Sequence, residues 1–169
     1  MGRRFSGPER LDSNHVLSGF DCGEPSLNLW LERYARTASG TNSARTYVVH
    51  DVEADRVVGY HALTLASISH DEATERAAKG MPRHPIPAVL LARLAVDRSV
   101  ASRGLGAFLL RDAMIRTVAV SEEAGTRLML AHALNEAAAS FYLHFGFEAS
   151  PSDPKNLQML VKDIEASLK

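Results

Sequence analysis

The spacing of apolar residues near the N-terminus predicts an amphipathic helix over residues 25–39. Four of them recur at intervals of three and four positions: Leu27, Trp30, Leu31 and Tyr34. This period places them on one face of a helix, which would pack against the rest of the protein. Pro25 suits the first turn of such a helix, and Gly40 suits its end.

Apolar runs further along the chain predict the strands of a sheet. Thr46–Val52 and Arg56–Ala66 are separated by only three residues, a spacing typical of a β-hairpin. Ala88–Val96 is almost continuously apolar, as expected for a central strand buried on both faces. Two more strands are expected over Arg127–Ala133 and Asn156–Val161.

Helical patterns alternate with the later strands. A short helix is expected over residues 71–79, a long one over Leu105–Val120 and a third over Glu136–Phe145. Gly146 suits the end of the third helix. A hairpin followed by alternating strands and helices indicates a mixed α/β or α+β sheet.

Composition restricts the class of protein. A chain of 169 residues with 46% hydrophobic residues is the size of one domain and can bury a core without disulfides or a structural metal. The single cysteine, Cys22, and the spacing of the seven histidines indicate no metal site. No secretory signal or membrane-spanning run is evident, so we expect a cytoplasmic protein. Residues 1–10 are interpreted as either a mobile basic arm or a disordered end.

The central part of the chain combines basic charge with a glycine turn. Residues 76–116 carry eight basic and two acidic side chains, although the net charge of the chain is −1. The segment ASRGLGAFLL (101–110) follows the apolar strand and opens a helix. Glycines allow close approach of the backbone, and free amides at a helix start attract anions, with Arg98 and Arg103 adding charge. This pattern indicates a phosphate site or simply a tight strand–helix connection.

A second segment with possible chemistry is LMLAHALNEAAASFYLHFGFE (128–148). Asn135 stands where a strand meets a helix, so it either caps the helix or contacts a ligand. Tyr142 carries a phenol that can act as a general acid, although a helical tyrosine more often only packs.

Together these two segments resemble the GNAT N-acetyltransferases. The resemblance rests on R-G-x-G between a strand and a helix, followed after a strand by N-x-A-A-x-x-F-Y-x-x-x-G-F. Both glycines of the family motif are present, and Ala101 stands where the family has Gln or Arg. The resemblance implies a single GNAT-like domain over residues 1–169, with a mixed, mostly antiparallel sheet flanked by helices and a splayed central strand pair.

A narrower resemblance covers almost the whole chain. FDCGEPSLNLWLERYA (20–35), SARTYVV (43–49), IPAVLLARLAVD (86–97) and SFYLHFGFEASP (140–151) are similar to the GNAT-type toxins of bacterial type II toxin–antitoxin modules. This resemblance implies transfer of acetyl from acetyl-CoA to the amino group of aminoacyl-tRNA, which blocks translation. It also implies a ribbon-helix-helix antitoxin as partner, and homodimers are common among the relatives.

The same resemblance implies residue roles. Tyr142 would protonate the leaving CoA thiolate, Asn135 would hold the coenzyme arm, and no general base is assigned. The backbone of three strand residues would bind the pantetheine: Leu94, Ala95 and Val96. The pyrophosphate would contact the turn and its neighbouring charge: Arg98, Ser102, Arg103, Gly104, Leu105, Gly106 and Ala107. Four arginines would contact tRNA or substrate: Arg36, Arg45, Arg83 and Arg93.

Two other functions remain open at this stage. The same fold could acetylate a small amine or a protein N-terminus. It could also be a non-catalytic CoA-fold partner of a DNA-binding antitoxin. An adjacent ribbon-helix-helix gene would argue against the small-amine function, and loss of toxicity in Tyr142→Phe would argue against the non-catalytic one.

Overall fold

The computed structural model describes residues 4–169 of the chain. These residues form two compact units: the first holds residues 4–64 and 93–113, and the second holds 65–92 and 114–169. The strands follow the order β1-β2-β3-β4-β5-β7-β6. All the strand pairings described below are antiparallel except that of β4 with β5. The predicted mixed, mostly antiparallel sheet is therefore confirmed.

The predicted hairpin forms the centre of the first unit. β2 (Arg45–Asp51) pairs with β3 (Arg56–Ile68) in antiparallel register, from Arg45↔Leu63 to Asp51↔Arg56. The N-terminal end was expected to be a mobile arm or disordered, but its residues from Phe5 onward form β1 (Phe5–Arg10), which pairs with β2. Residues 1–3 lie outside the described part of the chain.

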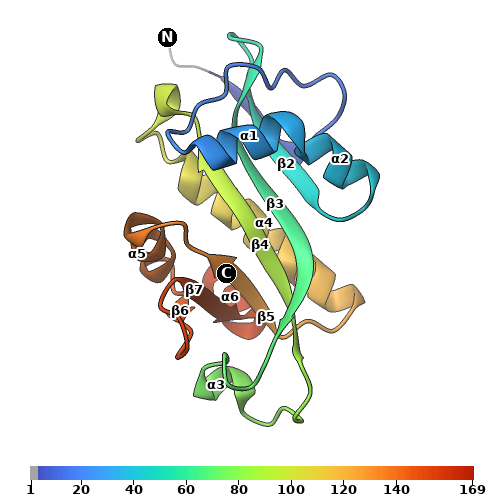
Figure 1. Cartoon of the computed structure of the whole chain (residues 1–169), viewed down its shortest axis with the longest axis vertical. Coiled ribbons are helices and arrows are strands. Elements are labelled where there is room, and N and C mark those ends of the chain that lie inside the picture. Colours follow the sequence, from blue (N-terminus) through green and yellow to red (C-terminus); the bar gives the residue numbers. More distant parts are fainter. Residues whose placement is uncertain (1–3) are drawn as a thin grey trace. The chain divides into compact units, whose positions relative to one another are not determined.

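The first predicted helix is divided into two. α1 (Pro25–Arg33) ends at Tyr34, and α2 (Ala35–Gly40) begins immediately after it. Tyr34, with φ −117° and ψ −22°, separates the two helices, so the prediction of one continuous helix was wrong. Three of the four residues predicted for the apolar face, Leu27, Trp30 and Leu31, pack in one cluster, where the Trp30 ring stacks on that of Tyr60 with centroids 6.0 Å apart. The prediction was wrong for Tyr34, which is 53% exposed. Figure 1 shows α1 and α2 crossing the strands β2 and β3.

A second apolar cluster in the first unit holds the start of α4 (Leu105–Glu123) against the sheet. Leu105 and Leu109 of the helix pack there with Val49 and Val58 of the hairpin. A side chain at Gly59 would place its Cβ only 3.1 Å from Leu109 Cδ1, so the glycine permits this close approach. The predicted helix is present and ends three residues later than expected.

The strands of the second unit follow the prediction. β4 (Ile86–Val96) runs parallel to β5 (Leu128–His132), and β7 (Asn156–Leu160) pairs with β5 on its other side. A short β6 (Glu148–Ala149), which the sequence did not predict, pairs with β7. The register of β4 with β5 ends at Leu91↔Ala131, although β4 continues to Val96. β5 itself ends at His132, so β4 extends past the end of its partner, and the predicted splay of the central strand pair stays a prediction.

The helices of the second unit agree less closely with the prediction. α3 (Glu75–Ala78) is only four residues long, because Thr74 accepts a hydrogen bond from the Ala77 amide (3.2 Å) and caps the helix there. α5 (Glu136–His144) forms as expected and stops before Gly146, whose φ is +101°. α6 (Val161–Leu168) was not predicted and follows β7 directly (Figure 1). Within the described range 4–169, no helix has the length and hydropathy required to cross a membrane.

Candidate functional site

The glycine turn after β4 has the geometry of an anion-binding helix start. A short 3₁₀ turn, η1 (Arg98–Val100), leads into a loop in which Ser102 and Gly104 have φ of +66° and +79°. The Phe108 amide donates to the Gly104 carbonyl oxygen at 3.1 Å, which begins the α4 ladder. The three preceding amides therefore have no acceptor in that ladder: Leu105, Gly106 and Ala107. Free amides at the positive end of the helix dipole favour an anion.

Asp97 holds the beginning of this turn in place. It is 3% exposed, and its carboxylate accepts hydrogen bonds from the Asp21 amide (2.9 Å), the Ser99 amide (2.9 Å) and the Arg56 guanidinium (3.1 Å). Burial opposes ionisation, but the Arg56 guanidinium and the two amides outweigh it and lower the pKa of Asp97 to about 2. Sequence reasoning assigned Asp97 no role, although an acidic residue directly after an apolar strand was a usable signal.

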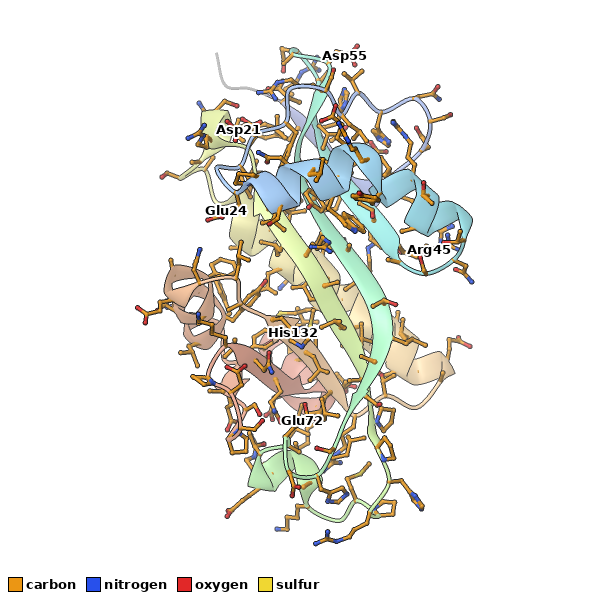
Figure 2. The ribbon with its side chains drawn as sticks, in the orientation of Figure 1. Asp21, Glu24, Arg45, Asp55, Glu72 and His132 are labelled. Atoms are coloured by element: carbon orange, nitrogen blue, oxygen red, sulfur yellow. The ribbon has the colours of Figure 1, made fainter. Side chains whose placement is uncertain are left out.

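The two arginines predicted for the phosphate differ in their surroundings. Arg98 is hydrogen-bonded to the carboxylate of Asp21, which is labelled in Figure 2. This carboxylate partly neutralises the charge of Arg98. The Gly23 amide and, after it, the Arg98 guanidinium lower the pKa of Asp21. Arg103 is exposed and makes no ion pair with any residue between 4 and 169. Arg103 is thus the better placed of the two for an added anion.

The three strand residues predicted to bind pantetheine lie at the end of β4. Ala95 packs in the cluster with Leu31, whereas Leu94 and Val96 pack in the cluster under α4. Their side chains thus alternate between the two faces, and their backbone lies beyond the last β4–β5 register pair. Their role in coenzyme binding stays a prediction.

Tyr142 lies in α5 of the second unit and is almost completely buried. It is 6% exposed, and its ring packs against Phe141 and Phe147 with centroids 5.4 Å away in each case. Burial raises the pKa of Tyr142 to about 12, so the phenol stays protonated at neutral pH. No hydrogen bond joins its hydroxyl to another residue of the described chain. The group can therefore donate a proton to a ligand.

Asn135 caps α5, which was one of the two roles considered for it. Its side-chain oxygen accepts a hydrogen bond from the Ala138 amide at 2.9 Å. This cap fixes the beginning of α5. Whether Asn135 also holds the coenzyme arm stays a prediction.

The four arginines predicted to contact tRNA or substrate do not form one group. Arg36 donates to the carbonyl oxygens of Asp12 and His15, and Arg45 donates to that of Ser39 at 2.9 Å (Figure 2). The Arg93 guanidinium lies 4.8 Å from the centroid of the Trp30 ring. All of these belong to the first unit. Arg83 belongs to the second, in the exposed loop between α3 and β4.

Other chemistry is not supported by the side-chain arrangement. Cys22 contacts the Glu24 carbonyl oxygen at 3.7 Å, and burial raises the pKa of its thiol, so it is a poor nucleophile. Among residues 4–169, His, Cys, Asp and Glu form no group of three that could hold a metal ion.

A mostly antiparallel sheet with one parallel strand pair, and a glycine turn at the start of the helix after β4, agree with the class of acyl-CoA-dependent acetyltransferases. The chain belongs to the GNAT acetyltransferase family, since the model of the acetyltransferase (GNAT) domain matches residues 42–149.

Three relatives place the chain within this family. It is 42% identical over 162 residues to the tRNA-acetylating toxin of Mycobacterium tuberculosis (strain ATCC 25618 / H37Rv), a match that covers 96% of each chain. It is similar to the structure of AtaT complexed with acetyl-methionyl-tRNAfMet, with 29% identity, a TM-score of 0.88 and coverage of 99% and 100%. A tyrosine-to-phenylalanine mutant of AtaT, bound to acetyl-CoA and the C-terminus of the antitoxin AtaR, matches with 29% identity, a TM-score of 0.82 and coverage of 99% and 98%.

Proposed function

We propose that the protein transfers the acetyl group of acetyl-CoA to the α-amino group of aminoacyl-tRNA and thereby blocks translation. The observation that carries this proposal is the 42% identity, over nearly the full length of both chains, to a tRNA-acetylating toxin. The buried, protonated phenol of Tyr142 and the glycine turn before α4 supply the chemistry that this reaction needs.

The two substrates supply the nucleophile and the acetyl group, and Tyr142 supplies the proton for the leaving group. The neutral α-amine attacks the thioester carbonyl carbon, the C–S bond breaks, and the amine loses a proton to water. Tyr142 donates its phenolic proton to the departing thiolate and is reprotonated from solvent. An α-amine has a pKa of about 7.7–8.0 in model peptides, so much of it is neutral near pH 7 without a dedicated base.

The coenzyme would be held through its phosphates and its amide-rich arm. We assign the pyrophosphate to the amides of residues 102–107 with Arg103 and Arg98, and the pantetheine to the backbone of residues 94–96. Asn135 would hold the arm near Tyr142. These assignments rest on the positive φ values of the turn, on the amides of α4 that have no acceptor in the helix, and on the extension of β4 beyond its last register pair with β5.

The biological setting follows from the same relationship. We propose a cytoplasmic toxin whose partner is a ribbon-helix-helix antitoxin, with a homodimer as the active assembly. Support for an antitoxin comes from AtaT, whose structures include the toxin bound to the C-terminus of AtaR and the AtaT–AtaR complex on DNA.

The test uses purified protein, labelled acetyl-CoA and total aminoacylated tRNA, with deacylated tRNA as control. Label should enter only the charged pool. Tyr142→Phe should lower kcat by roughly ten- to a thousandfold, at the lower end because a donor with a pKa near 12 is a weak acid. Phe145→Leu, on the same helix end but without a phenol, is the matched control and should retain most activity.

Two results would contradict the proposal. No label in any charged tRNA, with acetyl-CoA still bound, would redirect the search to small amines and protein N-termini. Binding of an antitoxin with no acetyl transfer to any acceptor would support a non-catalytic partner instead.

A further inference from the structure

The second unit contains a hollow lined almost entirely by basic residues. Its volume is about 460 Å³, and its lining consists of Arg76, Lys79, Gly80, Arg127 and Lys162. No carboxylate lines it, and these residues come from α3, the loop after it, the start of β5 and α6. We call this site the basic hollow.

Two of the four cations are fixed in place by the protein. Arg127 donates to the carbonyl oxygens of Ala77 (3.0 Å), Arg76 (3.2 Å) and Lys79 (3.1 Å). These hydrogen bonds fix the position of the guanidinium, and because carbonyl groups are neutral they leave its charge in place. Arg76 donates to Asp163 at 2.8 and 3.1 Å and contacts Glu148 at 3.4 Å. These bonds make a rigid wall out of segments that are distant in sequence.

The other two cations are available to a ligand. Lys79 and Lys162 are exposed, and neither makes an ion pair within the described range of the chain. With four cations against the Asp163 and Glu148 carboxylates, the hollow keeps a net charge of two positive units. A positively charged concavity of this kind attracts phosphate groups.

The position of the basic hollow within the second unit is compatible with the binding of a long polyanion. Arg127 comes directly before β5, whereas Asn135 and the helix with Tyr142 follow its other end. A strand of five residues spans roughly 17 Å. Double-stranded nucleic acid carries about one negative charge per 1.7 Å of its axis, so a duplex reaching past β5 presents many phosphates over this distance.

We propose that the basic hollow binds backbone phosphates of the aminoacyl-tRNA, away from the amino acid that is acetylated. This inference rests on the proposed function and adds to it a second contact surface for the same substrate. Lys79 and Lys162 supply mobile charges for the phosphates, while Arg127 and Arg76 shape the wall. Contacts of this kind position the RNA without reading its sequence.

The test compares charge reversals on the same helix. Lys162→Glu removes a cation from the hollow, and Lys169→Glu makes the same change in charge at the other end of α6. An acidic residue in the first turn of a helix is favoured by its dipole, so Lys162→Glu should fold normally, as circular dichroism can verify. Lys79→Ala provides a second, independent loss of charge in the loop.

We expect Lys162→Glu and Lys79→Ala to lower kcat/KM for full-length aminoacyl-tRNA by about tenfold, with a salt dependence shallower by about one phosphate contact each. The KM for acetyl-CoA and the acetylation of an aminoacylated CCA trinucleotide should not change. Lys169→Glu should stay within about twofold of the wild type.

Four outcomes would overturn the inference. Equal effects of Lys162→Glu and Lys169→Glu would show only a general effect of net charge. Loss of antitoxin binding with unchanged tRNA kinetics would assign the hollow to a protein partner. A wild-type protein that acetylates no charged tRNA would remove the proposed function itself, whereas an active wild type with unaffected variants would remove only this inference.

Discussion

The substitution Asp97→Asn tests whether the hydrogen bonds to the Asp97 carboxylate stabilise the protein and hold the glycine turn in the shape that binds the coenzyme. Asp97→Asn keeps the shape of the side chain but removes its charge. The NH₂ group of the amide would face at least one of the donors that now surround the carboxylate: the Asp21 amide, the Ser99 amide or the Arg56 guanidinium. One hydrogen bond would be lost, and the Arg56 charge would lose its partner.

The magnitude follows from the pKa of Asp97. Its fall from 3.8 to about 2 corresponds to about 2 kcal/mol of stability, at 1.36 kcal/mol per unit. Because the folded-state pKa is lowered, this stability is fully present above about pH 4 and is lost as the pH falls toward 2. We therefore expect Asp97→Asn to lower the free energy of unfolding by about 2 kcal/mol at pH 7, and by much less near pH 2.

The assay is urea denaturation of the wild type and the variant between pH 2 and 7. The difference between their free energies of unfolding is compared at each pH, because the contributions of the other carboxylates are the same in both proteins and cancel. Asp71→Asn, at an exposed position in a loop, is the control and should change stability by less than about 0.5 kcal/mol. The KM for acetyl-CoA should rise in Asp97→Asn while kcat changes less, because the residue positions the turn. A variant as stable as the wild type at pH 7, or a difference that persists near pH 2, would refute the reasoning.

Three further outcomes are expected. Gly104→Ala should lower stability by about 1 kcal/mol through its φ of +79° alone, since no atom lies within 4 Å of the added Cβ, and should weaken acetyl-CoA binding; an unchanged Tm and KM would contradict this. Arg93→Lys should lower the free energy of unfolding by about 0.5–1 kcal/mol, because the guanidinium stacked on Trp30 is lost. If both the denaturation curve and the tRNA kinetics are unaltered, Arg93 has neither a structural nor a substrate-binding role. The rate at fixed aminoacyl-tRNA should rise with pH up to about 8 as the α-amine becomes neutral, with no alkaline loss from Tyr142, whose pKa is near 12; a fall between pH 7 and 8.5 would indicate a different proton donor.

Residue periodicity predicted much of the fold because it reports local geometry. The hairpin of β2 and β3, the strands β4, β5 and β7, and the helices α4 and α5 all appear within a few residues of their predicted bounds. Alternating and continuous apolar runs are enough for this, since each strand or helix must bury one or both faces. The glycine turn and its resemblance to the GNAT family were also readable, because both glycines and Tyr142 lie in short contiguous segments.

Other features depended on contacts between distant parts of the chain. β1 is a strand only because β2 offers it an edge, and Tyr34 interrupts a helix that the apolar period alone would continue. Weak local preferences of this kind are overruled by tertiary packing.

The same distinction holds for the functional residues. The sequence by itself determined the family, the glycine turn and the candidate acid, because each lies within a single strand–turn–helix or helical segment. Only the tertiary structure decided that Arg36 and Arg45 bind backbone carbonyls, and that hydrogen bonds from residues 21 and 56 lower the pKa of Asp97. It also brought the cations of the basic hollow together from four segments. Charge, burial and hydrogen bonding depend on distances in space, and a linear pattern does not contain those distances.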